Sequence, residues 1–212
     1  MRAFTVPDFN AEGSVTERPK PAPGPGEILV RVKAAGVNPM DPVVVAGWMA
    51  GMMEHRKPLV PGFEYAGTVE AVGDGVEGID VGAEVFGGVG KMVFGEGSWA
   101  EYVTANAALA QRRPEGLSPE AAAAVPLACG TAIALLDAAD VGTDQVVLIV
   151  GLRAALGRMR CSLLRWSGRA WSRPLARRTP TTFGRWGRPT WSTAPAIWSR
   201  RSERSRPTAS TP

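Results

Sequence analysis

The chain has 212 residues and a formal net charge of +4 at pH 7, with 24 lysine and arginine residues against 20 aspartate and glutamate residues. Its two cysteines, Cys129 and Cys161, exclude a disulfide framework and are typical of a reducing cytosol. The N-terminus lacks a signal-peptide pattern and no apolar run approaches the roughly 18 residues of a membrane span, so we expect a soluble, cytoplasmic protein.

The first predicted element is a strand over residues 27–37. Ile28, Val30 and Val32 alternate with Arg31 and Lys33, which is the period-two pattern of a half-buried strand. Further short strands bounded by Gly or Pro are predicted at 65–72, 83–86 and 98–103. Many short strands at this spacing predict a compact, β-barrel-like domain.

The pattern changes at Ser118, where a helix is predicted to begin. Ser118 is a capping residue, Pro119 suits the first helical position, and Glu120 places an acid in the first turn. Pro126 ends or kinks this helix, and helical character resumes over 131–139. The apolar run 146–150 then predicts a strand buried on both faces, as in the parallel sheet of an α/β unit.

The composition changes abruptly at Gly151. All 22 valines precede it, whereas residues 151–212 hold 14 of the 24 basic residues, five of the seven tryptophans and a single acid, Glu203. The net charge is therefore −9 for residues 1–150 and +13 for residues 151–212. A segment with so many like charges and so few aliphatic residues is predicted to be disordered or non-native and to form no domain.

Four motifs, in order, resemble the medium-chain dehydrogenase/reductase superfamily, and specifically its zinc-independent quinone oxidoreductase-like branch. They lie at Ala34–Asp41, Pro61–Val69, Gly97–Val103 and Val125–Ala132. The resemblance implies a GroES-like β-barrel at 1–117, followed at 118–150 by the helix and first strand of a truncated Rossmann domain. It also implies an NADPH site between the two domains, and hydride transfer to a quinone, an enone or a related carbonyl.

The resemblance also bears on metal binding. Zinc-dependent relatives have Cys where this chain has Asn38 and His where it has Phe63, and Cys129 lies near the position of a third ligand. A catalytic zinc needs three protein ligands, so we expect no metal site. The single histidine, His55, is expected to be a solvated surface residue.

Without zinc, hydrogen bonds must stabilise the carbonyl oxygen that gains charge during hydride transfer. Asn38 is the first candidate, with a turn residue capping its own backbone as the alternative. Asp41 and Glu64 are further catalytic candidates, each with structural hydrogen bonds or salt bridges as the alternative. Tyr65 either donates a proton or packs in the core.

The expected cofactor-binding residues are Thr131, Val150 and Gly151. Thr131 matches the threonine that lies beside the nicotinamide in this family, with a role at a helix start as the alternative. Gly151 opens the segment where a Rossmann domain has its glycine-rich turn, but side chains occupy the place of the middle glycine. Residues 48–56, rich in Met and Gly, are expected to line the cleft.

A one-base frameshift near Gly151 accounts for this departure. Trp-Ser occurs four times after the break, beginning at Trp166, Trp171, Trp191 and Trp198. Trp has the single codon TGG, so if each of these serines is encoded TCN, reading the DNA from one base earlier turns each junction into GTC, a valine codon. With GC-rich codons chosen for the ambiguous positions and one G restored near codon 151, the shifted frame reads as the glycine-rich turn, an amphipathic helix and a second strand, followed by an Arg suited to the NADPH 2′-phosphate.

The sequence therefore predicts an NADPH-dependent oxidoreductase of the quinone reductase type that is inactive as translated. Its expected partner is a small carbonyl or quinone substrate, without nucleic acid or membrane. The intact protein is expected to be a homodimer, and this chain a monomer or an aggregate. Two alternatives stay open: a GroES-like domain with a basic Arg/Trp arm that binds nucleic acid, and a non-catalytic interaction remnant.

Overall fold

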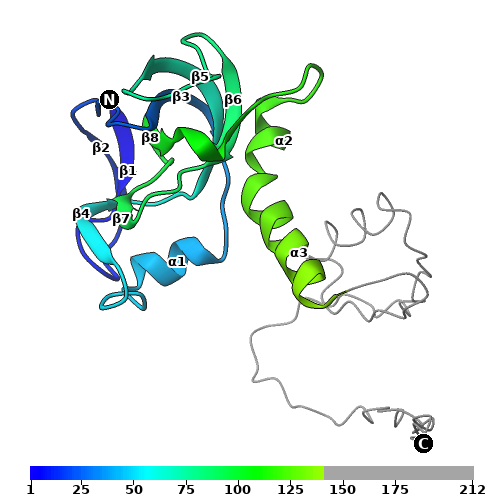
Figure 1. Cartoon of the computed structure of the whole chain (residues 1–212). Coiled ribbons are helices and arrows are strands. Elements are labelled where there is room, and N and C mark those ends of the chain that lie inside the picture. Colours follow the sequence, from blue (N-terminus) through cyan, green and yellow to red (C-terminus); the bar gives the residue numbers. More distant parts are fainter. Residues whose placement is uncertain (141–212) are drawn as a thin grey trace, which may run out of the picture. The chain divides into compact units, whose positions relative to one another are not determined.

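The computed structural model describes residues 1–140, so the predicted strand at 146–150 and everything after it lie outside the described part. A five-stranded antiparallel sheet, in the order β8-β3-β5-β6-β9, dominates this part (Figure 1). Its strands are β3 (Glu27–Ala35), β5 (Glu64–Val72), β6 (Glu84–Gly88), β8 (Tyr102–Asn106) and β9 (Ala110–Arg112), and a 3₁₀ turn at Ala107–Leu109 precedes the last.

Two smaller sheets complete the domain. One is the antiparallel pair β1 (Arg2–Thr5) and β2 (Ser14–Glu17), and the other is the parallel pair β4 (Glu54–Val60) and β7 (Val93–Glu96). The helix α1 (Met40–Val45) lies between β3 and β4 in the chain. None of these elements was predicted, because β1, β2 and β7 have four residues each and the expected loop 48–56 contains the charged start of β4.

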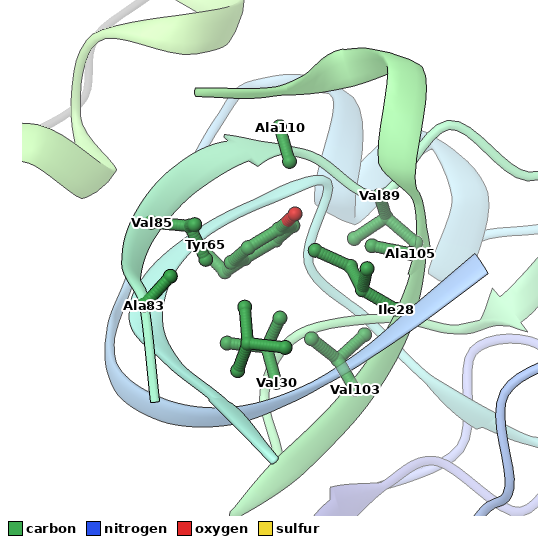
Figure 2. Packing of buried hydrophobic residues seen from close by; sticks show 10 residues of the cluster. Ile28, Val30, Tyr65, Ala83, Val85, Val89, Val103, Ala105 and Ala110 are labelled. Carbon is green, nitrogen blue, oxygen red and sulfur yellow. The ribbon is translucent and has the colours of Figure 1, made fainter. Parts of the chain in front are cut away.

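The strands curve around one apolar core, shown in Figure 2. Ile28 and Val30 of β3 enter it, as the predicted alternation requires, together with Val69 and Val85 from the neighbouring strands. The β-rich first domain is thereby confirmed. Tyr65 lies at the centre of the same core and is fully buried.

The fourth predicted strand begins later than expected, at Tyr102 rather than Ser98. The backbone N–H groups of Ser98 and Trp99 donate instead to the carbonyls of Gly62 and Pro61, at 3.2 and 3.0 Å. These two hydrogen bonds hold residues 98 and 99 against the residues that precede β5, so they do not pair with β3 as part of β8.

The predicted helix start at Ser118 is correct. Its Oγ accepts the Ala121 N–H at 3.2 Å and opens α2 (Pro119–Ala123), whose alanines pack on Ala66 of β5. The next helix, α3 (Pro126–Ala138), begins five residues before the predicted resumption at Thr131. Pro126 starts this helix because a residue in the first turn needs no intrahelical N–H partner.

Candidate functional site

Strand pairing builds the candidate site. In the antiparallel pair of β3 and β5, Ala35 lies opposite Tyr65, and the Gly36 N–H donates to the Glu64 carbonyl at 3.3 Å. The end of β3 therefore lies beside the start of β5, and Asn38 comes close to Glu64 although 26 positions separate them in the chain.

Glu64 is only 2% exposed and uses both carboxylate oxygens. Its Oε1 accepts a hydrogen bond from Asn38 Nδ2 at 2.7 Å, and its Oε2 accepts one from the Leu127 backbone N–H at 2.7 Å, in the first turn of α3. Gly36 lies against this carboxylate so closely that a Cβ there would come within 2.1 Å of Oε1. Glu64 was predicted either to be catalytic or to make structural hydrogen bonds, and these contacts are structural hydrogen bonds.

Asp41 is also 2% exposed and holds the same segment through its backbone. Its Oδ2 accepts the Asn38 N–H at 2.6 Å, and its Oδ1 accepts the Gly62 N–H at 2.9 Å. Burial raises the pKa of Asp41, and the two N–H donors oppose this effect. Asp41 therefore makes structural hydrogen bonds, which was the alternative to a catalytic role. The side chain that caps the backbone of the 38–41 turn is that of Asp41, not that of Asn38.

Asn38 is half-buried and held at both its backbone and its side chain. A carboxylate only accepts hydrogen bonds, so Nδ2 and not Oδ1 of the amide must face Glu64. The hydrogen bonds of residues 1–140 leave the second N–H of Nδ2 without a partner. Asn38 is thus an oriented hydrogen-bond donor with one N–H to spare.

Tyr65, the predicted proton donor, is enclosed in the core (Figure 2). Its hydroxyl is buried and has no hydrogen-bond partner within the described residues, and burial raises the pKa of this hydroxyl. The structure therefore favours the core alternative for Tyr65, because inward-facing residues of a curved sheet point away from solvent.

The prediction that His55 is a solvated surface residue is wrong. Its ring packs between Phe9 and Phe94, with centroids 5.1 Å from each, because β4 pairs with β7 and places His55 beside Phe94. Nδ1 lies 2.8 Å from the Met53 carbonyl oxygen and so carries the proton. Nε2 is buried, without a partner among residues 1–140.

The predicted cofactor-side residue Thr131 lies on α3 and is half-buried, one helical turn beyond Leu127. Since α3 begins at Pro126, Thr131 does not start a helix, and its alternative role does not apply. Cys129, on the same helix, is also half-buried, and burial together with the Glu64 charge raises the pKa of its thiol. The other two predicted cofactor residues, Val150 and Gly151, lie outside the described residues.

A cavity of about 260 Å³ adjoins Asp41 and Phe63. Its apolar walls are Val44, Val60, Phe63, Val89, Val93 and Phe94. None of residues 48–56, which were expected to line the cleft, borders this cavity, and Trp48 and Met52 are 77% and 74% exposed. Arg56 of this segment lines a second, larger cavity.

Sequence reasoning missed Lys91, which borders this cavity and a larger one of about 830 Å³. Its Nζ donates to Glu96 Oε2 and Thr104 Oγ1, at 2.6 Å each, and lies 3.4 Å from Glu27 Oε1. A single Lys in a glycine-rich loop gives no sequence signal of such a network, which only the fold assembles.

Two findings concern metals and membranes. Across residues 1–140, no group of three or more His, Cys, Asp or Glu side chains is placed to hold a metal ion. The helices of this described stretch include none with the length and apolar character of a membrane span.

The sequence is similar to a protein family and to several known proteins. Residues 24–115 match the alcohol dehydrogenase GroES-like domain family. The chain is 40% identical over 147 residues to a mycocerosic acid synthase-like polyketide synthase of Mycobacterium tuberculosis, covering 69% of this chain and 7% of that protein. It is 35% identical over 149 residues to the quinone oxidoreductase of Sus scrofa, covering 70% of this chain and 44% of the relative.

Solved structures give the same picture. An alcohol dehydrogenase superfamily protein from Novosphingobium aromaticivorans matches with a TM-score of 0.70 and 32% identity, over 78% of this chain and 50% of that one. The quinone oxidoreductase of Thermus thermophilus, also solved as its complex with NADPH, matches with a TM-score of 0.65 and 29% identity, over 78% and 50%. The chain spans half or less of the length of each of these four proteins, which favour the oxidoreductase prediction over the nucleic-acid alternative.

Proposed function

Because this chain belongs to the medium-chain dehydrogenase/reductase superfamily, we propose that its first 140 residues are the substrate-binding part of an oxidoreductase that reduces a quinone, an enone or a related carbonyl. Two-electron reduction of such a substrate adds a hydride and a proton. The chain's own residues must therefore bind the carbonyl and stabilise the charge that its oxygen gains.

The proposal rests on the way in which Asn38 is held. Two buried carboxylates fix this residue, and one N–H of its amide is left for a substrate oxygen. A donor that is already oriented needs no reorganisation when charge develops, which is why such donors accelerate acyl and hydride transfer. In this role Asn38 replaces the zinc ion of zinc-dependent relatives, whose ligand positions here hold Asn38 and Phe63.

The apolar cavity beside Asp41 supports a compact, lipophilic substrate. Its volume of about 260 Å³ and its walls of valine and phenylalanine side chains suit one unsaturated ring or a short apolar chain. The proton of the reduction comes from solvent in this scheme, since the Tyr65 hydroxyl is enclosed in the core.

The proposed cofactor is NADPH, which supplies the hydride when bound. Thr131 on α3 would lie on its nicotinamide side, as the family resemblance implies, while Val150 and Gly151 would belong to the segment that meets its phosphates. We also propose that the frameshift near Gly151 removes this phosphate-binding segment, so that the 212-residue chain does not sustain turnover.

The test compares two proteins: the 212-residue chain, and the product of the same gene with one G restored near codon 151. NADPH oxidation is followed by absorbance with 1,4-benzoquinone as acceptor. We expect turnover only from the frame-restored protein, and NADPH affinity in a fluorescence titration only there.

The Asn38→Ala variant of the frame-restored protein tests the site. Its kcat should fall about 100-fold or more, as for loss of one preorganised donor, while its NADPH affinity stays unchanged. Turnover by the 212-residue chain would disprove the inactivity proposal. A frame-restored protein without quinone or enone reductase activity would disprove the proposed function itself.

A further inference from the structure

We propose that Glu64 is a positioning residue that joins the substrate side of the site to the cofactor side. Its carboxylate accepts hydrogen bonds from Asn38 Nδ2 and from the Leu127 N–H at the same time, so it fixes the Asn38 amide relative to the first turn of α3. The inference rests on the proposed function, because Asn38 is there the group that binds the substrate oxygen.

The carboxylate of Glu64 determines the orientation of the Asn38 side-chain amide. An amide has a donor end and an acceptor end, and either end could face position 64 if the side chain there could both donate and accept. Glu64 only accepts, so the donor end of Asn38 is held at the carboxylate, with Nδ2 at 2.7 Å from Oε1. The second N–H of the same nitrogen is then fixed as well, because the amide group is planar.

The other oxygen of Glu64 fixes α3. The Leu127 N–H is one of the first-turn donors that have no partner within a helix, and Glu64 Oε2 accepts it at 2.7 Å. A negative charge also suits a helix N-terminus. Because residues four apart lie on one side of a helix, Thr131 stands one turn above the fixed Leu127.

The surroundings show that Glu64 acts through Asn38 rather than on a substrate. The carboxylate is 2% exposed, and within the described residues no lysine, arginine or histidine pairs with it. Gly36 is needed beside it, since any Cβ there would overlap Oε1. The carboxylate is thus built into the fold with two amide donors as its partners.

The first experiment uses the unmodified 212-residue chain. Couplings transmitted across hydrogen bonds are measured by NMR between the Glu64 carboxyl carbon and two nitrogens, Asn38 Nδ2 and Leu127 N. We expect both couplings to be detected. If the resonances are assigned and either coupling is missing, Glu64 does not join the two elements and the proposal is wrong.

The second experiment is Glu64→Gln, with Glu70→Gln as the matched control on an exposed position of the same strand. The two N–H groups bond to different oxygens of Glu64, and glutamine has an acceptor oxygen at only one of these two positions and an NH2 donor at the other. We expect the Asn38 side-chain amide resonances to shift, because Asn38 either loses its acceptor or turns its own oxygen toward the new amide at position 64. If Asn38 keeps its donor end at position 64, the Leu127 N–H loses its acceptor and exchange of its amide proton speeds up by about tenfold or more. The control should leave both signals unchanged, and unchanged signals in Glu64→Gln would overturn the proposal.

A double variant, Asn38→Asp with Glu64→Gln, separates positioning from simple structural support. It reverses the polarity of the pair, because the new carboxylate at position 38 accepts from the new amide at position 64. We expect Leu127 protection to return to within about threefold of the unmodified chain, whereas the donor to a substrate oxygen is lost.

Turnover in the frame-restored protein supplies the last readout. Glu64→Gln should lower kcat about tenfold or more at unchanged NADPH affinity, and the double variant should recover Leu127 protection but not kcat. Recovery of kcat by the double variant would overturn the positioning role. If the couplings are present but the frame-restored protein reduces nothing, the proposed function fails while the link made by Glu64 stands.

Discussion

Tyr65, in β5, and Asn38, in the segment that follows β3, show how differently two polar residues can be used. The Tyr65 hydroxyl is buried without a hydrogen-bond partner in the described part of the chain, while both N–H donors of Asn38 that the structure engages end on buried carboxylates. An unpaired buried hydroxyl destabilises the fold, whereas a fixed amide donor is what carbonyl chemistry needs.

The first prediction concerns Tyr65→Phe. Removing an unpaired hydroxyl should leave the free energy of unfolding unchanged or raise it by up to about 2 kcal/mol. Urea denaturation measures the change. The control is Tyr102→Phe, which removes the hydroxyl of a tyrosine that is half-buried rather than enclosed in the core, and it should not raise stability. A clear loss of stability in Tyr65→Phe would show that the hydroxyl has a partner after all.

The second prediction is a pH dependence that belongs to Asp41. Burial raises the pKa of this carboxyl above its ordinary value of about 4, so above that pH the folded chain holds a proton that the unfolded chain has lost. The free energy of unfolding contributed by Asp41 therefore falls as pH rises through this window.

The Asp41→Asn variant isolates this contribution, because all other carboxylates titrate alike in both chains. We expect the stability of the unmodified chain relative to the variant to decrease as pH rises from about 4 to 6. Denaturation curves of both proteins over this range provide the measurement. A relative stability that increases with pH would mean that the two N–H donors outweigh burial.

Among the helices and strands, a helix start specified by residues adjacent in the chain was predicted, whereas a strand pair that depends on long-range pairing was not. The helix start at Ser118 was predicted because a cap, a proline and an acid are adjacent in the chain. The parallel pair of β4 and β7 was not, because its partners are about 40 residues apart and β4 contains Arg56, Lys57 and Pro58. Edge strands of this kind tolerate charge and proline, so their sequence resembles a loop.

The third prediction tests that cap. Ser118→Ala removes the Oγ that accepts the Ala121 N–H and should lower the free energy of unfolding by about 1 kcal/mol. Ser118→Asp keeps an acceptor at the same position and should retain most of the stability. Thermal denaturation of the two variants beside the unmodified chain decides between a cap that matters and one that solvent replaces.

At the scale of the whole molecule, the chain joins two unlike compositions. Residues 1–150 carry a net charge of −9 and residues 151–212 one of +13, and the overall value of +4 describes neither. The relatives continue for at least as long again as the matched part, with this chain covering 44% of the quinone oxidoreductase of Sus scrofa. The frameshift hypothesis accounts for the change of composition and charge at Gly151.

The fourth prediction follows from it. Sequencing the coding DNA across codons 149–153 should reveal a position where one added base opens a frame that encodes a glycine-rich turn and a second strand. The control is the frame upstream, which should remain unchanged. An uninterrupted frame in independently isolated DNA, with the Arg/Trp-rich segment intact, would refute the hypothesis. It would favour the alternative of a basic arm that binds nucleic acid.

The sequence by itself determined the β-rich first domain, the strands β3 and β5, the helix start at Ser118 and the family resemblance. These depend on alternation, capping and short motifs, which are local along the chain. Only the tertiary structure decided which of Asn38, Asp41, Glu64 and Tyr65 face one another, and that His55 is enclosed by aromatic rings. The reason is physical: the pairing of β3 with β5 sets the distances between residues far apart in sequence, and burial then fixes which of their polar atoms find partners.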